Sequence, residues 1–133
     1  MKNILLISLL FILTSFNTSS ILHVEGNAYT DGKAVDCQVD IVNRETKISK
    51  VLYTENGKYS FNLPLNYSYI LLFYRDSCQI KVVDIVTYGD TSQSYKYKFD
   101  VSLPVMKDKM KMVHSVAKVY YDNTAKQYTH KYY

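Results

Sequence analysis

The chain has 133 residues, with 16 lysines and arginines against 12 acidic residues and a formal net charge of +4. This length suits one domain with a modest hydrophobic core. The positive charge is mild and the lysines are scattered, so the sequence lacks the dense basic face that nucleic-acid binding requires, and we exclude that class of function.

The first 20 residues have the pattern of a secretory signal peptide. Lys2 supplies the positive start, residues 4–13 are almost uninterrupted apolar residues, and small polar residues follow up to Ser20. The alternative is a membrane anchor, but the apolar run is shorter than the roughly 20 residues that a membrane span needs. We therefore expect residues 1–20 to be removed. We expect the mature chain to be exported to the periplasm, the outer membrane or the medium, without a membrane span.

Residues 21–104 have the pattern of an all-β sandwich. Short runs rich in tyrosine, valine and isoleucine, which strands prefer, alternate with turn residues at intervals of about 8–12 residues. The seven predicted strands are 22–30, 35–42, 48–53, 58–63, 67–74, 79–87 and 95–103. Residues 69–73 are apolar without a break, which predicts a central strand that is covered on both sides or closely flanked by its neighbours.

The clearest local signal is the turn Asn56-Gly57, which separates two of these predicted strands. After the turn, Tyr59, Phe61 and Leu63 alternate strictly with polar residues. This pattern is typical of a β-hairpin with one buried face.

The two cysteines, Cys37 and Cys78, permit a single disulfide in an exported protein. Cys37 alternates with Val35 and Val39, so its side chain is expected to face the core. The alternative is that both cysteines are buried thiols that act as small apolar groups. The sequence does not give the separation of their Cα atoms, so both interpretations stay open.

Residues 105–133 form a C-terminal extension beyond the predicted sandwich. Residues 105–112 fit one or two helical turns or a loop, and residues 113–121 predict a further strand. The tyrosines of the extension are Tyr120, Tyr121, Tyr128, Tyr132 and Tyr133. Two interpretations are open. The extension covers an open sheet edge and its tyrosines hold it on the sandwich, or their rigid rings bind a protein or a sugar.

The sequence offers no catalytic, cofactor-binding or metal-binding motif. Nucleophilic catalysis needs a serine or cysteine beside a base, but His23, His114 and His130 lie in no recognisable motif. There is no glycine-rich phosphate loop and no zinc spacing. Asp36 and Asp40 share a strand face, where solvated charges are far more common than the six or more oxygen ligands of a calcium site. We therefore expect no enzymatic activity, no cofactor and no metal.

The spacing of the glycines, of the small apolar residues and of the Asn-Gly turn resembles the carboxypeptidase regulatory-like domain. The residues that carry the resemblance are Gly26, 31–35, Val39, Ile41 and 54–61. The resemblance covers about residues 22–87. It implies a transthyretin-like, seven-stranded Greek-key sandwich that serves as an accessory module of the bacterial envelope, with the extension added at its end.

Residues 116–122 also look like the end of small stand-alone secreted bacterial proteins of this type. The hydroxyisourate hydrolase branch of the transthyretin-like proteins ends in a Tyr-Arg-Gly-Ser signature, which the ending Lys131-Tyr132-Tyr133 lacks. The resemblance therefore implies a non-enzymatic accessory protein that binds another envelope protein. The alternative is a carbohydrate-binding module that stacks exposed tyrosines on a glycan.

Overall fold

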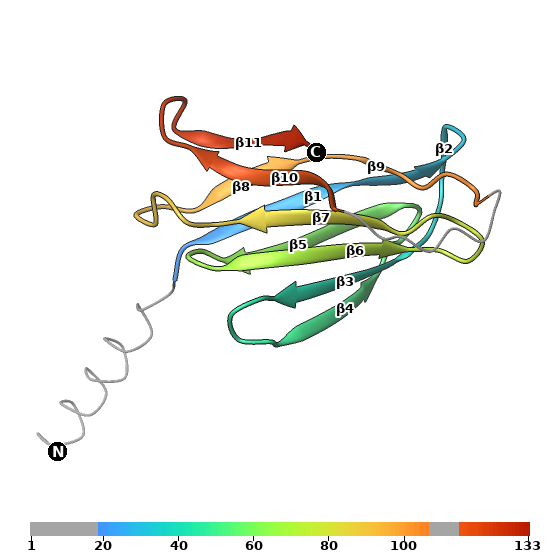
Figure 1. Cartoon of the computed structure of the whole chain (residues 1–133), viewed down its shortest axis with the longest axis horizontal. Helices are drawn as coiled ribbons and strands as arrows, with labels where there is room; N and C mark the ends of the chain where they lie inside the picture. Colours follow the sequence, from blue (N-terminus) through green and yellow to red (C-terminus); the bar gives the residue numbers. More distant parts are fainter. Residues whose placement is uncertain (1–18, 107–114) are drawn as a thin grey trace, which may run out of the picture.

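The computed structural model of the chain describes residues 19–106 and 115–133 (Figure 1). These residues form a sandwich of two mixed β-sheets, which confirms the predicted all-β sandwich class. Most of the predicted signal peptide, His114 and most of the segment predicted as helical turns or a loop lie outside the described residues. Within the described ranges, no helix is long and apolar enough to span a membrane.

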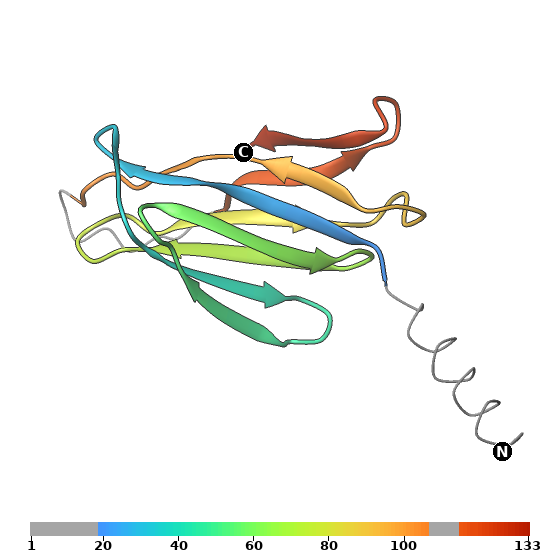
Figure 2. The same cartoon turned by 180° about the vertical axis from the view of Figure 1, so that it is seen from behind.

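The first sheet is built around β1 (Ile21–Thr30). Its antiparallel neighbours are β5 (Lys58–Pro64) and the short β2 (Lys33–Ala34), and its parallel neighbours are β8 (Tyr95–Lys98) and β9 (Val101–Ser102). Figure 2 views the molecule from the side of this sheet. Along β5, buried and exposed residues alternate without exception, as the sequence predicts.

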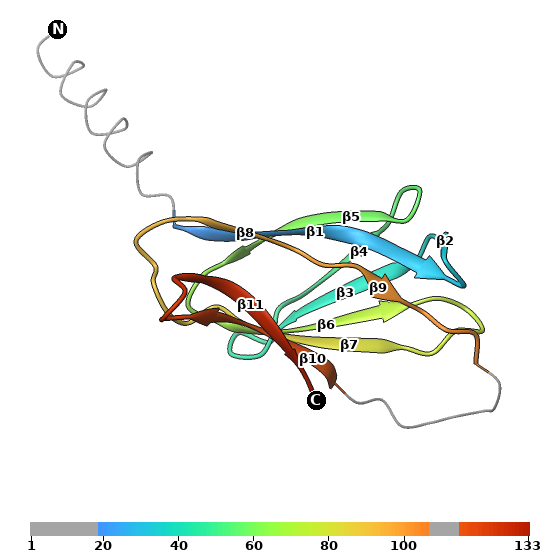
Figure 3. The same cartoon turned by 90° about the horizontal axis from the view of Figure 1, so that it is seen from above.

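The second sheet contains six strands. In spatial order they are β11 (Gln127–Tyr132), β10 (Ser115–Asp122), β7 (Lys81–Val86), β6 (Ser68–Tyr74), β3 (Gln38–Asn43) and β4 (Ser49–Tyr53). β10 runs parallel to β7, and the other neighbours are antiparallel. Figure 3 shows this sheet and the first sheet as two layers seen edge-on. The apolar run 69–73 therefore lies in a central strand that is closely flanked by β3 and β7. This is one of the two environments that the sequence predicted for it.

The core lies between the two sheets and takes alternate side chains from both. Its largest fully buried apolar side chains are Phe73, Leu22, Leu71, Ile85, Leu103, Val24, Val39 and Val119. Burying a side chain of this size contributes about 1.5–3 kcal/mol to stability. Val119 belongs to β10, so the C-terminal extension contributes to the core of the sandwich.

The turn Asn56-Gly57 forms as predicted, but the predicted hairpin around it is wrong. Asn56 and Gly57 have φ angles of 53° and 78°, as a two-residue turn requires. The strands on either side nevertheless belong to different sheets, because β4 pairs with β3 and β5 pairs with β1. The Gly57 carbonyl accepts a hydrogen bond from the N–H of Ala28 in β1, 2.8 Å away, which holds the turn at the point where the chain changes sheet.

The described residues form eleven strands, and two differences from the sequence prediction have clear causes. The predicted strand 95–103 is divided, because an Asp100 carboxylate oxygen accepts the N–H of Asn27 at 2.9 Å and so replaces a backbone partner. The strand β11 was not predicted, because the sequence there is polar and lacks a clear alternation. The chain turns into β11 after Asp122, whose carboxylate accepts the N–H of Thr124 at 2.9 Å.

Candidate functional site

Two of the five tyrosines considered for partner binding pack against the core: Tyr128 is buried and Tyr121 is partly buried. The side chain of Tyr128 is 5% exposed. Its ring lies edge-on to the rings of Tyr95 and Tyr121, with centroid distances of 5.4 and 5.5 Å. This cluster joins β8 of the first sheet to β10 and β11 of the second. Tyr128 therefore fastens the C-terminal hairpin to the sandwich and is not accessible to a partner.

The other three tyrosines of the extension reach the surface at different places. Tyr132 and Tyr133 are 76% and 67% exposed. The Tyr133 hydroxyl donates to a carboxylate oxygen of Asp84 at 2.9 Å, which fixes this side chain on the outside of the second sheet. Tyr120 lies on the same side, partly covered by the Lys131 ammonium group 5.9 Å from its ring centre. The five tyrosines do not form one flat cluster.

The outer face of the second sheet carries several partly exposed apolar side chains. Alternation decides which side chains lie there: Tyr69, Leu71 and Phe73 of β6 are buried in the core, so their neighbours point outward. The registers of the sheet place further apolar residues beside them. We call the following set the apolar outer face: Val42, Val51, Tyr53, Ile70, Leu72, Tyr74, Val86 and Tyr120.

The side chains of the apolar outer face are all at least partly exposed, and none belongs to the main core cluster. Figures 1 and 3 show no described strand lying over this face. Apolar side chains grouped on one exposed face mark interaction sites more often than isolated ones do. In the sheet, Gln38, Asp40 and Asp84 lie between the apolar side chains of this face. The sequence showed the apolar run in β6, but it did not indicate that one side of the run would face outward.

Two carboxylates on this face have partners, and Lys118 of β10 also lies on the face, opposite Asp84. Arg44 binds Asp84 with 2.9 Å between the guanidinium nitrogen and a carboxylate oxygen, beside the hydroxyl of Tyr133. Asp40 accepts a hydrogen bond from Gln38 at 2.8 Å. Exposed pairs of this kind add little to stability. A partner would therefore meet a neutral Arg44–Asp84 pair together with the charges of Asp40 and Lys118.

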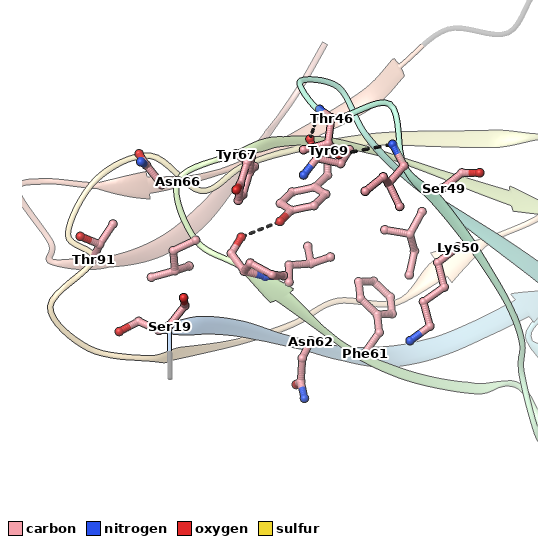
Figure 4. A pocket seen from close by; sticks show the side chains of 17 residues that line it. Ser19, Thr46, Ser49, Lys50, Phe61, Asn62, Asn66, Tyr67, Tyr69 and Thr91 are labelled. Atoms are coloured by element: carbon pink, nitrogen blue, oxygen red, sulfur yellow. Dashed lines mark hydrogen bonds between the residues drawn. The ribbon is translucent and has the colours of Figure 1, made fainter. Parts of the chain in front are cut away.

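A groove of about 840 Å³ opens between β5 of the first sheet and the β3–β4 pair of the second (Figure 4). The buried side chains of Phe61 and Tyr69, which belong to the core, lie at the bottom of this groove. The Tyr69 hydroxyl donates to the carbonyl oxygen of Pro64 at 2.6 Å, and burial raises the pKa of this tyrosine. Lys50 of β4 lies along one wall of the groove.

His23, Ser60 and Asn62 form the arrangement closest to a catalytic one. The His23 Nδ1 atom lies 2.6 Å from the side-chain oxygen of Asn62, and its Nε2 atom lies 3.3 Å from the Ser60 hydroxyl. The contacts follow from the register of β1 and β5, since His23 is directly opposite Asn62. All three lie on the exposed face of the first sheet, where acyl transfer would lack the water-excluded, preorganised donors that it needs.

The structure has Cys37 and Cys78 as free thiols, both buried. The disulfide that the sequence permitted is not formed, and the alternative of two small buried groups describes their environment. Desolvation by burial raises the pKa of the Cys37 thiol, which disfavours a reactive thiolate. The Cys78 sulfur lies 3.9 Å from the Thr30 hydroxyl.

The two carboxylates considered for calcium binding have separate structural roles. Asp36 accepts the N–H of Gly57 at 2.8 Å and the hydroxyl of Thr54 at 3.2 Å, so it supports the turn between the sheets. Asp40 binds Gln38 instead. Within residues 19–106 and 115–133, no three histidine, cysteine or acidic side chains come together as metal ligands would.

Comparison with known proteins gives little to add to this geometry. No family model matches the chain, and no curated protein is significantly similar to it in sequence. Among solved structures, it is similar to catechol 1,2-dioxygenase from Acinetobacter sp. ADP1, inhibited by bound mercury, with a TM-score of 0.48 and 11% sequence identity. That similarity covers 75% of this chain and 60% of the dioxygenase chain. It is too weak to carry an argument about the function of this chain.

Proposed function

We propose that the chain is a non-enzymatic accessory protein of the bacterial envelope that binds another envelope protein through its apolar outer face. The supporting observation is the set of partly exposed aliphatic and aromatic side chains that five neighbouring strands present on one side of the second sheet. Export belongs to the proposal because residues 1–20 have the pattern of a signal peptide.

The energetics favour a protein partner for such a face. Fully burying one of these side chains contributes about 1.5–3 kcal/mol. A few central anchors, such as Ile70 and Leu72, together with the aromatic side chains around them, would offset the cost of association and give micromolar binding, which corresponds to about 8 kcal/mol. Protein interfaces combine an apolar centre with polar groups that have hydrogen-bond partners. On this face, the Asp84 carboxylate has two such partners, Arg44 and Tyr133.

We also propose that the fold is that of the carboxypeptidase regulatory-like domain. In this interpretation residues 21–104 form the seven-stranded, transthyretin-like Greek-key sandwich, and residues 105–133 add β10 and β11 to it. Supporting pairings are those of β3 with β4 and β6, of β6 with β7, and of β1 with β5 and β8. The accessory role commonly found in that family agrees with the proposed function.

The test is to isolate the complexes that the tagged full chain forms in its own cells, for a variant of each sheet. Leu72→Lys places a charge in the centre of the apolar outer face, where the long side chain still reaches solvent. Ser60→Lys places the same charge on the exposed side of β5. We expect one companion protein at constant stoichiometry that is lost with Leu72→Lys and kept with Ser60→Lys. Equal recovery of that protein with both variants would contradict the proposal.

A glycan is the alternative ligand, and one observation favours it. Tyr53 of β4 and Tyr74 of β6 lie directly opposite Gln38 of β3, one on each side of that strand. Tyr53 is 72% exposed and Tyr74 is 43% exposed. Two strand spacings separate the rings, about 9.5 Å, with an amide between them. Binding on a glycan array that is lost in Tyr53→Ala and kept in Tyr132→Ala would support this alternative, whereas an array without a hit would argue against it.

A further inference from the structure

The strand β4 is an edge of the second sheet, and its outer face carries apolar side chains without a charge. A strand with one neighbour presents unpaired N–H and C=O groups, and lysine or proline commonly prevents such an edge from pairing with another chain. The other long edge strands carry such residues: Lys58 and Pro64 on β5, Lys96 and Lys98 on β8, and Lys131 on β11.

β4 and its approach instead expose apolar side chains. Ile48, Val51 and Tyr53 are 69%, 50% and 72% exposed. The single lysine of β4, Lys50, lines the groove between the sheets and is an inward-pointing charge, while the residues that alternate with it on the outer face carry no charge.

The hydrogen bonds between β3 and β4 show which backbone groups of β4 remain free. The bonds at the two ends of this pairing are Asn43 N–H to the Ile48 carbonyl, 2.9 Å, and Thr54 N–H to the Cys37 carbonyl, 3.0 Å. Bonded pairs recur at every second residue of an antiparallel ladder. Ser49, Val51 and Tyr53 therefore direct their N–H and C=O groups away from β3, towards the open edge.

We propose that β4 pairs antiparallel with β4 of a second copy of this chain, with the two-fold axis at Val51. In such a dimer, the second sheet of one copy and the second sheet of the other join into one continuous sheet. This arrangement requires a two-fold axis perpendicular to the sheet. Residues directly opposite each other in an antiparallel pair have their side chains on the same face. Rotation about this axis keeps each side chain on its face. The axis must therefore lie at a residue that is opposite the same residue of the second copy.

Three residues at the centre of β4 satisfy this condition, and Val51 is favoured over its two neighbours. With the axis at Val51, Ser49 is opposite Tyr53 and every outward-facing group of the strand finds a partner. With the axis at Lys50, two ammonium groups are directly opposed, which is destabilising. With the axis at Leu52, Ser49 lies beyond the end of the partner strand and its outward groups are unmatched.

The pairing has a geometric consequence for the rest of the molecule. A two-fold axis perpendicular to the sheet leaves both apolar outer faces on the same side of the dimer. The dimer forms through the backbone groups of β4, and Val51 and Tyr53 belong both to this edge and to the apolar outer face.

The first test measures the molar mass of the protein, purified after expression of the full chain, by light scattering over a range of concentrations. We expect a dimer that dissociates on dilution. Val51→Lys opposes two charges at the axis and should raise the dissociation constant about tenfold or more, which corresponds to at least about 1.4 kcal/mol. Val51→Thr should retain the dimer, as should Thr129→Lys on the edge strand β11. A monomer at every concentration up to the solubility limit would overturn the proposal.

The second test reads the register. Cα atoms opposite each other in a bonded antiparallel pair lie about 5.5 Å apart, which suits a disulfide. Under oxidation, Val51→Cys should therefore form covalent dimers, and the unaltered chain should not, because Cys37 and Cys78 are buried. Covalent dimers through Lys50→Cys or Leu52→Cys in place of Val51→Cys would overturn the axis at Val51.

Discussion

Tyr95 of β8 and Tyr128 of β11 pack edge to face with 5.4 Å between their ring centroids, and this contact joins the first sheet to the end of the second. The Tyr95 hydroxyl donates to a carboxylate oxygen of Asp90 at 2.6 Å. The Tyr128 hydroxyl is buried and has no hydrogen-bond partner among the described residues. Both rings pack in the same cluster, but only the Tyr95 hydroxyl has a hydrogen-bond partner among the described residues.

We expect Tyr128→Phe to leave the protein as stable as before or to stabilise it by about 1 kcal/mol. The substitution keeps the ring contacts and removes a buried polar group whose desolvation is not compensated, a penalty of about 1–3 kcal/mol. Tyr128→Ala should destabilise the protein by about 3–5 kcal/mol, because it leaves a cavity between the sheets. Denaturant unfolding of both variants measures the two effects.

Tyr59→Phe is the matched control for this prediction. The Tyr59 hydroxyl is also largely buried, but it donates to the carbonyl oxygen of Phe99. Its removal should cost about 0.5–1.5 kcal/mol and leave the carbonyl unpaired. If Tyr128→Phe were as destabilising as Tyr59→Phe, the hydroxyl of Tyr128 would have a partner in solution and the account of the contact would be wrong.

We expect Gly26→Ala to destabilise the protein by about 2–3 kcal/mol or more through overpacking. A Cβ atom at Gly26 would lie 1.6 Å from the carbonyl oxygen of Phe99 and 2.4 Å from the Tyr59 hydroxyl, so β1, β5 and the segment after β8 would have to separate. Thermal unfolding measures the effect.

Gly32→Ala is the control for Gly26→Ala. Gly32 has a φ of 77° and nothing within 4 Å of its Cβ position, so the substitution adds only backbone strain of about 1–2 kcal/mol. Equal losses at Gly26 and Gly32 would mean that the close approach of β1 to Phe99 does not exist in solution.

Stability should fall with rising pH above about pH 10, the ordinary pKa of tyrosine. Desolvation by burial raises the pKa of Tyr59 and Tyr69, and raises the pKa of Tyr128 to about 12. Their neutral forms are favoured in the folded state, so stability is fully present below pH 10. It is lost progressively above that, as the unfolded chain ionises first.

The slope of the melting temperature against pH between 10 and 12 measures this linkage. In Tyr128→Phe, unfolding in that range should release about one proton fewer than in the unaltered chain. An unchanged slope in the variant would show that Tyr128 titrates normally in the folded protein and is therefore not buried.

The addition of a reductant should not change the melting temperature, because Cys37 and Cys78 are free thiols. Alkylation in denaturant without reductant should modify both cysteines, whereas alkylation of the folded protein should be slow. A mass that shows no alkylation until a reductant is added would mean that the protein contains the disulfide after all.

The sequence predicted the parts of the fold in which local pattern and burial agree. The strands around Val24, Phe61 and Leu71 appear within one residue of their predicted ends, because strict alternation or an unbroken apolar run is imposed by the core. The turn at Gly57 was also predicted, because its positive φ requires such a residue.

Pairing between distant segments was not predictable in the same way. Alternation shows which residues share a face, but not which sheet a strand joins, so the strands on either side of Gly57 were assigned to one hairpin. The tyrosines of the extension posed a similar problem. Tyr128 and Tyr132 have the same chemistry, and only the placement of β11 over β8 buries one and exposes the other. The apolar outer face depends on such pairings throughout.

The most direct test of the account is photo-cross-linking in living cells with a photoreactive amino acid at the position of Leu72, compared with the position of Ser60. The account predicts that the Leu72 position gives one defined adduct with another envelope protein, and that the Ser60 position, on the exposed side of the first sheet, does not. Adducts of the same pattern from both positions, or none from Leu72, would contradict binding through the apolar outer face.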